Sequence, residues 1–144
     1  MSSAVTEATR SYRQHRFAPP PGSTELLLVR HGESEPAVAD RPFPLVDGHG
    51  DPALAPEGRA QAARVCARLA GEHIDAIYVS KLRRTAETAA ELAATLGIEP
   101  VVDPDLHEVY LGEWEGGAFR RHVAEGHPAA ITMMAEELGR HPRR

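Results

Sequence analysis

The chain has 144 residues, of which 42% are hydrophobic and 26% are charged. These proportions are close to average globular usage, so we expect one folded domain and exclude a chain that is disordered throughout. Sixteen Lys and Arg against twenty-one Asp and Glu leave a formal net charge of −5, which disfavours bulk binding to nucleic acid or to an anionic membrane, since both depend on a positive field.

The cysteine content and the amino terminus predict the compartment. Cys66 is the only cysteine, so the chain cannot form an internal disulfide, and its Ala-rich neighbours indicate a small buried hydrophobe in a reducing compartment. The amino-terminal residues contain no apolar stretch long enough for a signal peptide, and nowhere do eighteen apolar residues follow one another. We therefore expect a cytoplasmic protein.

The first elements in chain order are a tail, a strand, a long loop and a helix. Residues 1–23 mix Ser, Thr, Arg and Gln and end in a proline run, which predicts a disordered tail before a domain at 24–144. The apolar run at 25–30 predicts a buried strand. Residues 32–56 are rich in Pro, Gly and Asp and show no period, so we expect a long loop. From Pro56 onward apolar residues recur at helical spacing and a glycine stops the pattern, which predicts an amphipathic helix.

A second strand, a second helix and a third strand follow. Residues 74–79 predict a strand, Ser80 is the expected N-cap of the next helix, and 98–102 predict another strand. The apolar stripe of the helix is expected at five positions: Leu82, Thr85, Ala89, Leu92 and Leu96. This order indicates an α/β fold with a mostly parallel sheet and helical crossovers. Residues 118–138 look helical, with a break at Pro128.

Two Arg-containing segments leave the carboxyl ends of the first two predicted strands. Arg30-His31-Gly32 follows the first strand, and Arg84 lies just beyond the second. Ligands of an open parallel sheet collect at this edge, near helix N-termini that favour anions, so we expect both arginines at one crevice. Arg-His-Gly alone is a weak signal in an Arg-rich chain. Its position directly after a strand favours a function, because glycine allows a tight turn and close approach to a ligand.

Four motifs resemble those of the histidine phosphatase superfamily, also called the phosphoglycerate mutase-like family. The segment LVRHGES at 28–34 is similar to its signature, SKLRRTAETA at 80–89 to its S-x-L-x-R-A-x-x-T-A, and LHEVYLGEWEG at 106–116 to its L-x-E-x-x-x-G-x-W-E-G. The start of a family helix is matched at four positions: Leu54, Gly58, Gln61 and Ala62. The motifs occur in the family's order and span about 26–116.

The resemblance implies a three-layer, mostly parallel sheet flanked by helices, and a phosphate-transfer site that needs no metal or other cofactor. It assigns the nucleophile to His31, phosphate binding to Arg30 and Arg84, and the general acid to Glu108. These residue types suit the roles. An imidazole can carry a phosphoryl group, arginine forks neutralise phosphoryl oxygens, and a carboxyl kept protonated by burial or by its neighbours can protonate the leaving alkoxide.

The sequence departs from the family pattern in three places. Thr85 stands where the second motif usually has Ala, and Ala37 stands where many enzymes acting on sugar phosphates carry Asn, which disfavours a glycolytic mutase. The family's second catalytic histidine, followed by Gly at the end of a later strand, has no counterpart after Glu108. We therefore expect a family member whose C-terminal part is missing, with a weakened phosphate site and weak or absent activity.

Three functions follow from these patterns. The first is hydrolysis of phosphomonoesters through a phosphohistidine, the second is a non-catalytic phosphate-binding or interaction module, and the third is mutase-type phosphoryl transfer. We expect a small phosphorylated molecule as the partner, and neither nucleic acid nor a membrane. The substrate and the oligomeric state stay open.

Other polar residues have structural interpretations. We expect Trp114 to be a packing residue. We expect a surface position for five others: Arg83, His73, His107, Glu113 and Glu115. The segment DGHGD at 47–51 offers carboxylates and an imidazole to a metal, although alternating small residues with Asp and His is also ordinary loop composition.

Overall fold

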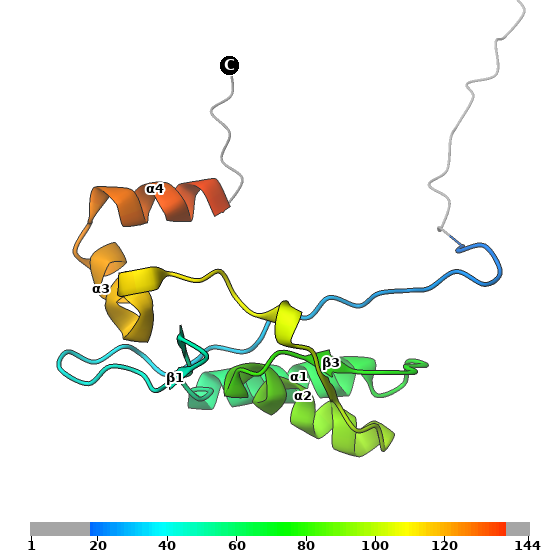
Figure 1. Cartoon of the computed structure of the whole chain (residues 1–144). Helices are drawn as coiled ribbons and strands as arrows, with labels where there is room; N and C mark the ends of the chain where they lie inside the picture. Colours follow the sequence, from blue (N-terminus) through cyan, green and yellow to red (C-terminus); the bar gives the residue numbers. More distant parts are fainter. Residues whose placement is uncertain (1–17, 138–144) are drawn as a thin grey trace, which may run out of the picture.

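The computed structural model describes residues 18–137 (Figure 1). Most of the predicted tail at 1–23 therefore lies outside the described residues, as does the end of the domain predicted at 24–144. Residues 18–23 are exposed and contain no helix or strand. None of the helices in the described part is long and apolar enough to cross a membrane.

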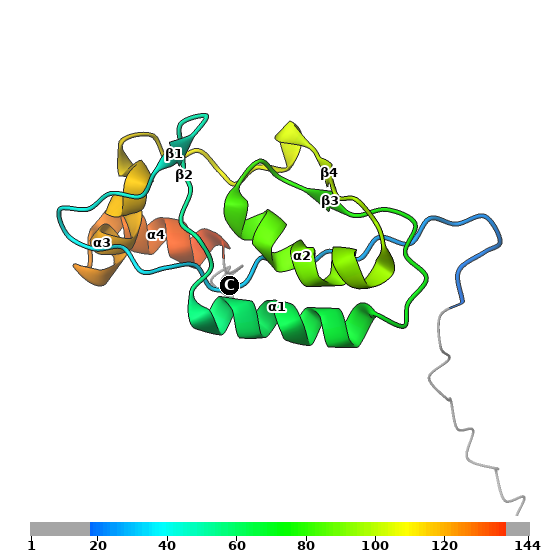
Figure 2. The ribbon, with the colours of Figure 1, turned by 90° about the horizontal axis from the view of Figure 1, so that it is seen from below.

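Two helices and a pair of parallel strands form the centre of the molecule. Helices α1 (Pro56–Leu69) and α2 (Arg83–Leu96) pack against each other on one side of β3 (Tyr78–Val79) and β4 (Val101–Val102) (Figures 1 and 2). The strands are in register through Tyr78 and Val101. The connection from β3 through α2 to β4 is the strand–helix–strand order predicted from the sequence, and the fold is α/β. The strands are shorter than predicted, because only 78–79 of 74–79 and 101–102 of 98–102 pair.

The core lies mainly between α1 and α2. Leu54 is fully buried, and most other buried apolar side chains come from these helices and from the residues just before them: Ala62, Cys66, Val79, Leu82 and Leu92. Cys66 is buried as predicted, and its sulfur lies 3.5 Å from the hydroxyl of Thr95. The helix that brings Cys66 inward begins with Pro56 at its first turn, also as predicted.

The start of α2 differs from the prediction. Ser80 is not the N-cap: its hydroxyl accepts a hydrogen bond from Leu82 N at 3.2 Å within the preceding turn, and the helix begins at Arg83. The cap comes from a distant loop instead, because Asp51 Oδ1 accepts from Arg83 N at 2.7 Å. Gly97 ends the helix in the left-handed conformation with φ 68°.

The buried face of α2 is also turned relative to the predicted stripe. The buried helical residues are Arg84, Thr88, Leu92 and Ala93, of which only Leu92 was predicted. Arg84 and Thr88 are four residues apart and share one face. Hydrophobic periodicity alone could not reveal this face, because two of its buried members are polar.

The predicted strand at 25–30 is not formed. Residues 25–30 contain no strand, and Leu26 and Leu28 are 78% and 94% exposed. The physical reason is the lack of a neighbour in the described chain: β3 pairs with β4, and no other strand lies beside 25–30 to satisfy its backbone.

The predicted loop at 32–56 contains a short hairpin of β1 (Leu45–Val46) and β2 (His49–Gly50). Asp47 and Gly48 join the strands with φ of 49° and 83°, the two positive values that a tight two-residue hairpin turn requires. Downstream lie the 3-10 helices η1 (Pro104–Leu106) and η2 (Gly112–Gly117).

Two further helices end the described chain. Helix α3 (Ala118–Ala124) packs on η2 and on α4 (Pro128–Glu137). The predicted helical break at Pro128 is confirmed, because the proline opens α4. Both helices lie to one side of the α1–α2 pair (Figure 2).

Candidate functional site

The loop that carries His31 is held between the two central helices. From α2, the hydroxyl of Thr88 accepts a hydrogen bond from Gly32 N at 3.0 Å and donates to Arg84 O at 2.7 Å. From α1, Gln61 Oε1 accepts from Glu33 N at 2.8 Å. Each helix therefore fixes one peptide group next to His31.

Two glycines let the loop touch α1. A Cβ on Gly58 would lie 1.9 Å from the carbonyl oxygen of Glu33, and a Cβ on Gly32 would lie 2.4 Å from the carbonyl oxygen of Gly58. No other residue can take either place without moving the backbone. The glycine of the Arg-His-Gly tripeptide is thus required by packing against α1.

The His31 ring is oriented by the backbone carbonyl of the next residue, Gly32. Nδ1 lies 2.8 Å from the carbonyl oxygen of Gly32, which can only accept, so Nδ1 carries the proton. Nε2 then has a free electron pair and accepts from Nε of Arg84 at 3.2 Å. Burial lowers the pKa of His31 below its ordinary value of 6.5. The Gly32 carbonyl opposes this shift, whereas the charges of Arg84 and Arg30 add to it. The ring is therefore neutral at neutral pH.

Arg84 is a buried cation at the first turn of α2. Its side chain donates to His31 and, through Nη1, to the carbonyl oxygen of Gly50 at 2.8 Å. Burial lowers its pKa, and the carboxylates of Glu108, Asp51 and Glu115 oppose that shift. No carboxylate among the described residues lies within ion-pair distance of its guanidinium.

Carboxylates fasten the hairpin and the residues just after it to α2 and to η2. Glu87 accepts from Leu54 N at 2.6 Å, and Asp51 caps α2. Glu115 accepts from Gly50 N at 2.7 Å and from Leu111 N at 3.0 Å. The expectation of an exposed loop carboxylate is wrong for Glu115, which is only partly exposed, because both of its oxygens hold backbone amides. Composition gave no signal for this role.

Glu108 and Arg30 line two different cavities, and His31 lines both. Glu108 lines a small cavity of about 150 Å³ together with His31 and Arg84. Its side chain is exposed and accepts from Val109 N at 3.0 Å, so the burial expected for a general acid is not present in the described chain. Arg30 is exposed and lines a second, larger cavity that also begins at His31. The structure thus brings together all four residues singled out from the sequence.

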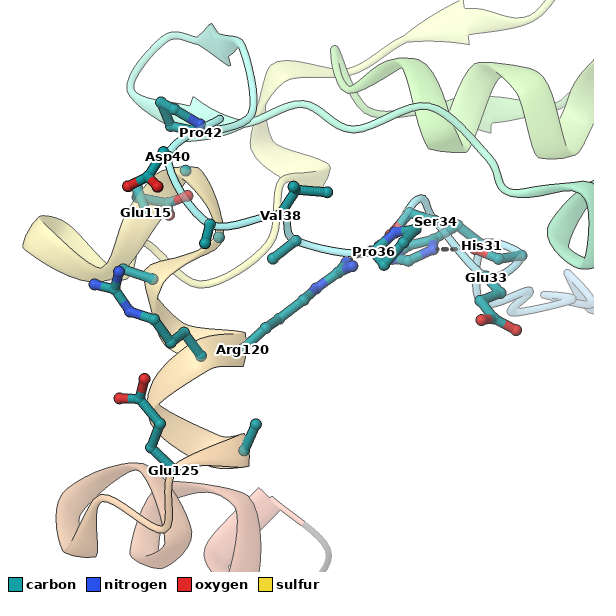
Figure 3. Close-up of a pocket in the computed structure, with 18 of the residues that line it drawn as sticks. His31, Glu33, Ser34, Pro36, Val38, Asp40, Pro42, Glu115, Arg120 and Glu125 are labelled. Atoms are coloured by element: carbon teal, nitrogen blue, oxygen red, sulfur yellow. Dashed lines mark hydrogen bonds between the residues drawn. The ribbon is translucent and has the colours of Figure 1, made fainter.

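The larger cavity is a groove of about 1260 Å³ (Figure 3). One wall is the segment that follows His31, through Val38 to Pro42, and the other is formed by η2 and α3. Ala37, at the position where the family often has Asn, lines this groove. Arg120 reaches across the groove from α3, and sequence reasoning missed this residue because no motif covers it.

The remaining candidates have structural surroundings. Arg83 is exposed and pairs with Glu87, and His73 and His107 are exposed, as expected. Trp114 packs against Phe119 at a ring distance of 6.0 Å. Within 47–51, Asp47 pairs with Lys81 and Asp51 caps α2. In residues 18–137 no three His, Cys, Asp or Glu side chains gather as metal ligands.

Comparison with known proteins gives concordant matches. A family profile, histidine phosphatase superfamily (branch 1), matches residues 26–143. Phosphoserine phosphatase 1 of Hydrogenobacter thermophilus is 35% identical over 113 residues, covering 78% of this chain and 51% of that protein. Phosphoglycerate mutase-like protein 4 of Arabidopsis thaliana is 43% identical over 94 residues, covering 64% and 39%.

A solved structure is similar over the same region. Mycobacterial glucosyl-3-phosphoglycerate phosphatase in complex with VO3 matches with a TM-score of 0.57 at 30% identity, covering 71% of this chain and 49% of that one. The chain spans about half the length of the relatives it matches.

Proposed function

Because the chain belongs to the histidine phosphatase superfamily, we propose that it hydrolyses phosphomonoesters through a phosphohistidine formed on His31. The observation that carries the proposal is the state of the His31 ring. Its Nδ1–H donates to Gly32 O and its pKa is lowered by burial, so Nε2 is unprotonated; in the free site the Nε2 electron pair accepts a hydrogen bond from Arg84.

The first step is transfer of the phosphoryl group to His31. Nε2 attacks phosphorus, the bond from phosphorus to the ester oxygen breaks, and Glu108 gives the leaving alkoxide a proton. Arg84, which donates to Nε2 in the free site, lies where it can turn its N–H groups to the phosphoryl oxygens, and Arg30 adds a second positive charge.

The second step returns His31 to its free state. A water molecule attacks phosphorus, the bond from Nε2 to phosphorus breaks, and Glu108 takes the proton from the water. An exposed Glu108 is accessible to that water, and the cavity that it shares with His31 supports a role for both groups in one reaction.

The names of the relatives support a small phosphorylated substrate. They include a phosphoserine phosphatase and a glucosyl-3-phosphoglycerate phosphatase. The proposal places the reaction in the cytoplasm, because the single cysteine is buried and cannot form an internal disulfide.

The test compares the chain with two histidine variants. Hydrolysis of an aryl phosphate and acid-labile labelling by a radioactive phosphate donor are expected for the unchanged chain. His31→Ala should lose both, whereas His73→Ala, at a side chain that is 90% exposed, should retain both. Equal activity of His31→Ala and the unchanged chain would rule the mechanism out.

A second candidate is a phosphate-binding module without turnover. The observation that favours it is the buried Arg84, which is held by Gly50 and His31 and would bind phosphate whether or not hydrolysis follows. A rise in melting temperature with vanadate, without hydrolysis or labelling, would select this candidate. The third hypothesis is mutase-type transfer, in which the phosphoryl group moves between hydroxyl groups of the substrate and no phosphate is released.

A further inference from the structure

The short strand β2 holds Arg84 through the residue next to His49. The carbonyl oxygen of Gly50 accepts from Nη1 of Arg84 at 2.8 Å, and Gly50 N donates to Glu115 at 2.7 Å. His49 precedes Gly50 on the same strand and is partly buried. The backbone of His49 is therefore fixed close to Arg84, and its side chain can connect Arg84 to another part of the site.

The ring of His49 contacts two aromatic rings from the segment that carries Glu108. Its centre lies 4.7 Å from the ring centre of His107, with the planes tilted by 40°, and 5.4 Å from that of Tyr110, in an edge contact at 65°. The Tyr110 ring also lies beside the hairpin turn, because a Cβ on Gly48 would meet its Cε2 at 3.5 Å. Glu108 is thus flanked along the chain by two residues that pack on one histidine.

The segment 108–110 is held only weakly by its own backbone. It belongs to no helix or strand, and within residues 18–137 it shares no hydrogen bond from backbone to backbone. The hydrogen bonds of Glu108 are local: its carbonyl oxygen accepts from Nδ1 of His107 at 2.9 Å, and its carboxylate accepts from Val109 N at 3.0 Å. The ring contacts with His49 therefore connect this segment to the hairpin where its own hydrogen bonds do not.

Contact places the His49 ring more than hydrogen bonding does. Nδ1 donates to the carbonyl oxygen of Asp47 at 3.3 Å, which is long for a hydrogen bond, and Nε2 is buried with no hydrogen-bond partner in the described part of the chain. A buried polar atom without a partner costs free energy. A flat ring that lacks this nitrogen should therefore fill the same place, which makes phenylalanine the conservative substitute.

We infer that His49 is a positioning residue whose ring holds Glu108 at the phosphate cavity for proton transfer. The inference rests on the proposed function, in which Glu108 protonates the leaving alkoxide. Glu108 lines that cavity together with His31 and Arg84, and β2 fixes Arg84 through Gly50. One hairpin strand thus sets the place of the proton donor relative to Arg84. Such geometry matters because the acid must lie within hydrogen-bond reach of the ester oxygen.

The experiment compares two substrates that differ in their need for a proton. Ethyl phosphate releases an alkoxide and needs the proton of Glu108, whereas 4-nitrophenyl phosphate releases a stable phenoxide and does not. The rate measured is release of the alcohol in the first turnover, before the phosphohistidine is hydrolysed. His49→Ala should lower this rate about tenfold to a hundredfold for ethyl phosphate and change it by less than about twofold for 4-nitrophenyl phosphate.

Three controls separate positioning from folding. His49→Phe keeps a flat ring and should restore most of the rate with ethyl phosphate. His73→Ala removes a histidine side chain that is 90% exposed, so it should keep the full rate. Vanadate should bind to His49→Ala as tightly as to the unchanged chain, because His31 and Arg84 are still in place.

Other results would overturn the inference. An equal loss of rate for both substrates, or weaker binding of vanadate, would show that His49 supports Arg84 or the fold. Unchanged rates would show that His49 is not needed, and a His49→Phe variant as slow as His49→Ala would exclude the ring contact as the cause.

The unchanged chain tests the premise separately. Release of alcohol from 4-nitrophenyl phosphate alone would exclude Glu108 as the acid, and the inference with it, while His31 could still carry the phosphoryl group. If neither substrate reacts with the unchanged chain, the proposed function itself fails, and the inference falls with it.

Discussion

At the scale of single residues, the surroundings of His31 lower the pKa of its ring. Burial and two arginines lower its pKa, so an NMR titration of its ring should have a midpoint below 6.5. The unfolded chain protonates this histidine more readily than the folded chain does. The free energy of unfolding should therefore decrease as the pH falls from 6.5 toward the folded pKa.

Arg84→Gln provides the control for this titration. It removes one of the two positive charges that lower the pKa of His31, so the midpoint should move upward while burial keeps part of the shift. A midpoint at or above 6.5 in the unchanged chain would contradict the prediction and leave His31 partly protonated at neutral pH.

Thr88 carries a second residue-scale prediction. Its hydroxyl is the acceptor for Gly32 N, the amide adjacent to His31, and it donates to Arg84 O. Thr88→Val keeps the shape but leaves a buried amide without a partner, so it should lower the free energy of unfolding by about 1–3 kcal/mol in urea titrations. Thr88→Ser keeps the hydroxyl and should cost clearly less. Similar losses for the two variants would assign the effect to packing.

At the scale of elements, the contact between α1 and the loop that carries His31 depends on Gly58. Alanine normally stabilises a helix relative to glycine, but a Cβ here would collide with the carbonyl oxygen of Glu33 at 1.9 Å. Gly58→Ala should therefore destabilise the chain by about 1–3 kcal/mol, as overpacking does, and should reduce phosphate binding because the loop must move.

Gly71→Ala, at a glycine just beyond the end of α1, is the matched control. Nothing lies within 4 Å of a Cβ at Gly71, so thermal melting should show no loss of stability. An increase in the melting temperature of Gly58→Ala would contradict the contact between α1 and the loop.

The elements also show what the sequence could and could not predict. Helix α1, the end of α2 at Gly97 and the break at Pro128 follow from local chemistry, and the structure has all three. The cap of α2 by Asp51 and the clamp of Gly50 by Glu115 join residues 32 and 65 positions apart. No local pattern contains such pairs, so they could not be predicted.

The candidate site was predictable for a different reason. Arg30, His31, Arg84 and Glu108 belong to motifs whose order resembles that of a family, and the structure gathers them around His31. Arg120 belongs to no motif. Its contacts with Ser34 and Glu35 form because α3 packs beside the segment after His31, and only the tertiary structure shows this packing.

At the scale of the whole molecule, stability is concentrated between α1 and α2, while apolar residues lie exposed elsewhere. Four large apolar residues are at least half exposed: Leu26, Leu28, Tyr78 and Val102. Neither of the two-stranded sheets in the described residues includes any of residues 25–30. Apolar area that stays in contact with water contributes little to folding. The chain should therefore depend on a few residues around Leu54.

A pair of identical substitutions tests this distribution. Leu54 is 0% exposed and Leu28 is 94% exposed, so the same change removes the same atoms from opposite environments. Leu54→Ala should lower the free energy of unfolding by about 2–5 kcal/mol, whereas Leu28→Ala should change it by less than about 0.5 kcal/mol. Equal losses in urea titrations would mean that residues 25–30 are buried as a strand in solution. The buried strand predicted from the apolar run at 25–30 would then be correct.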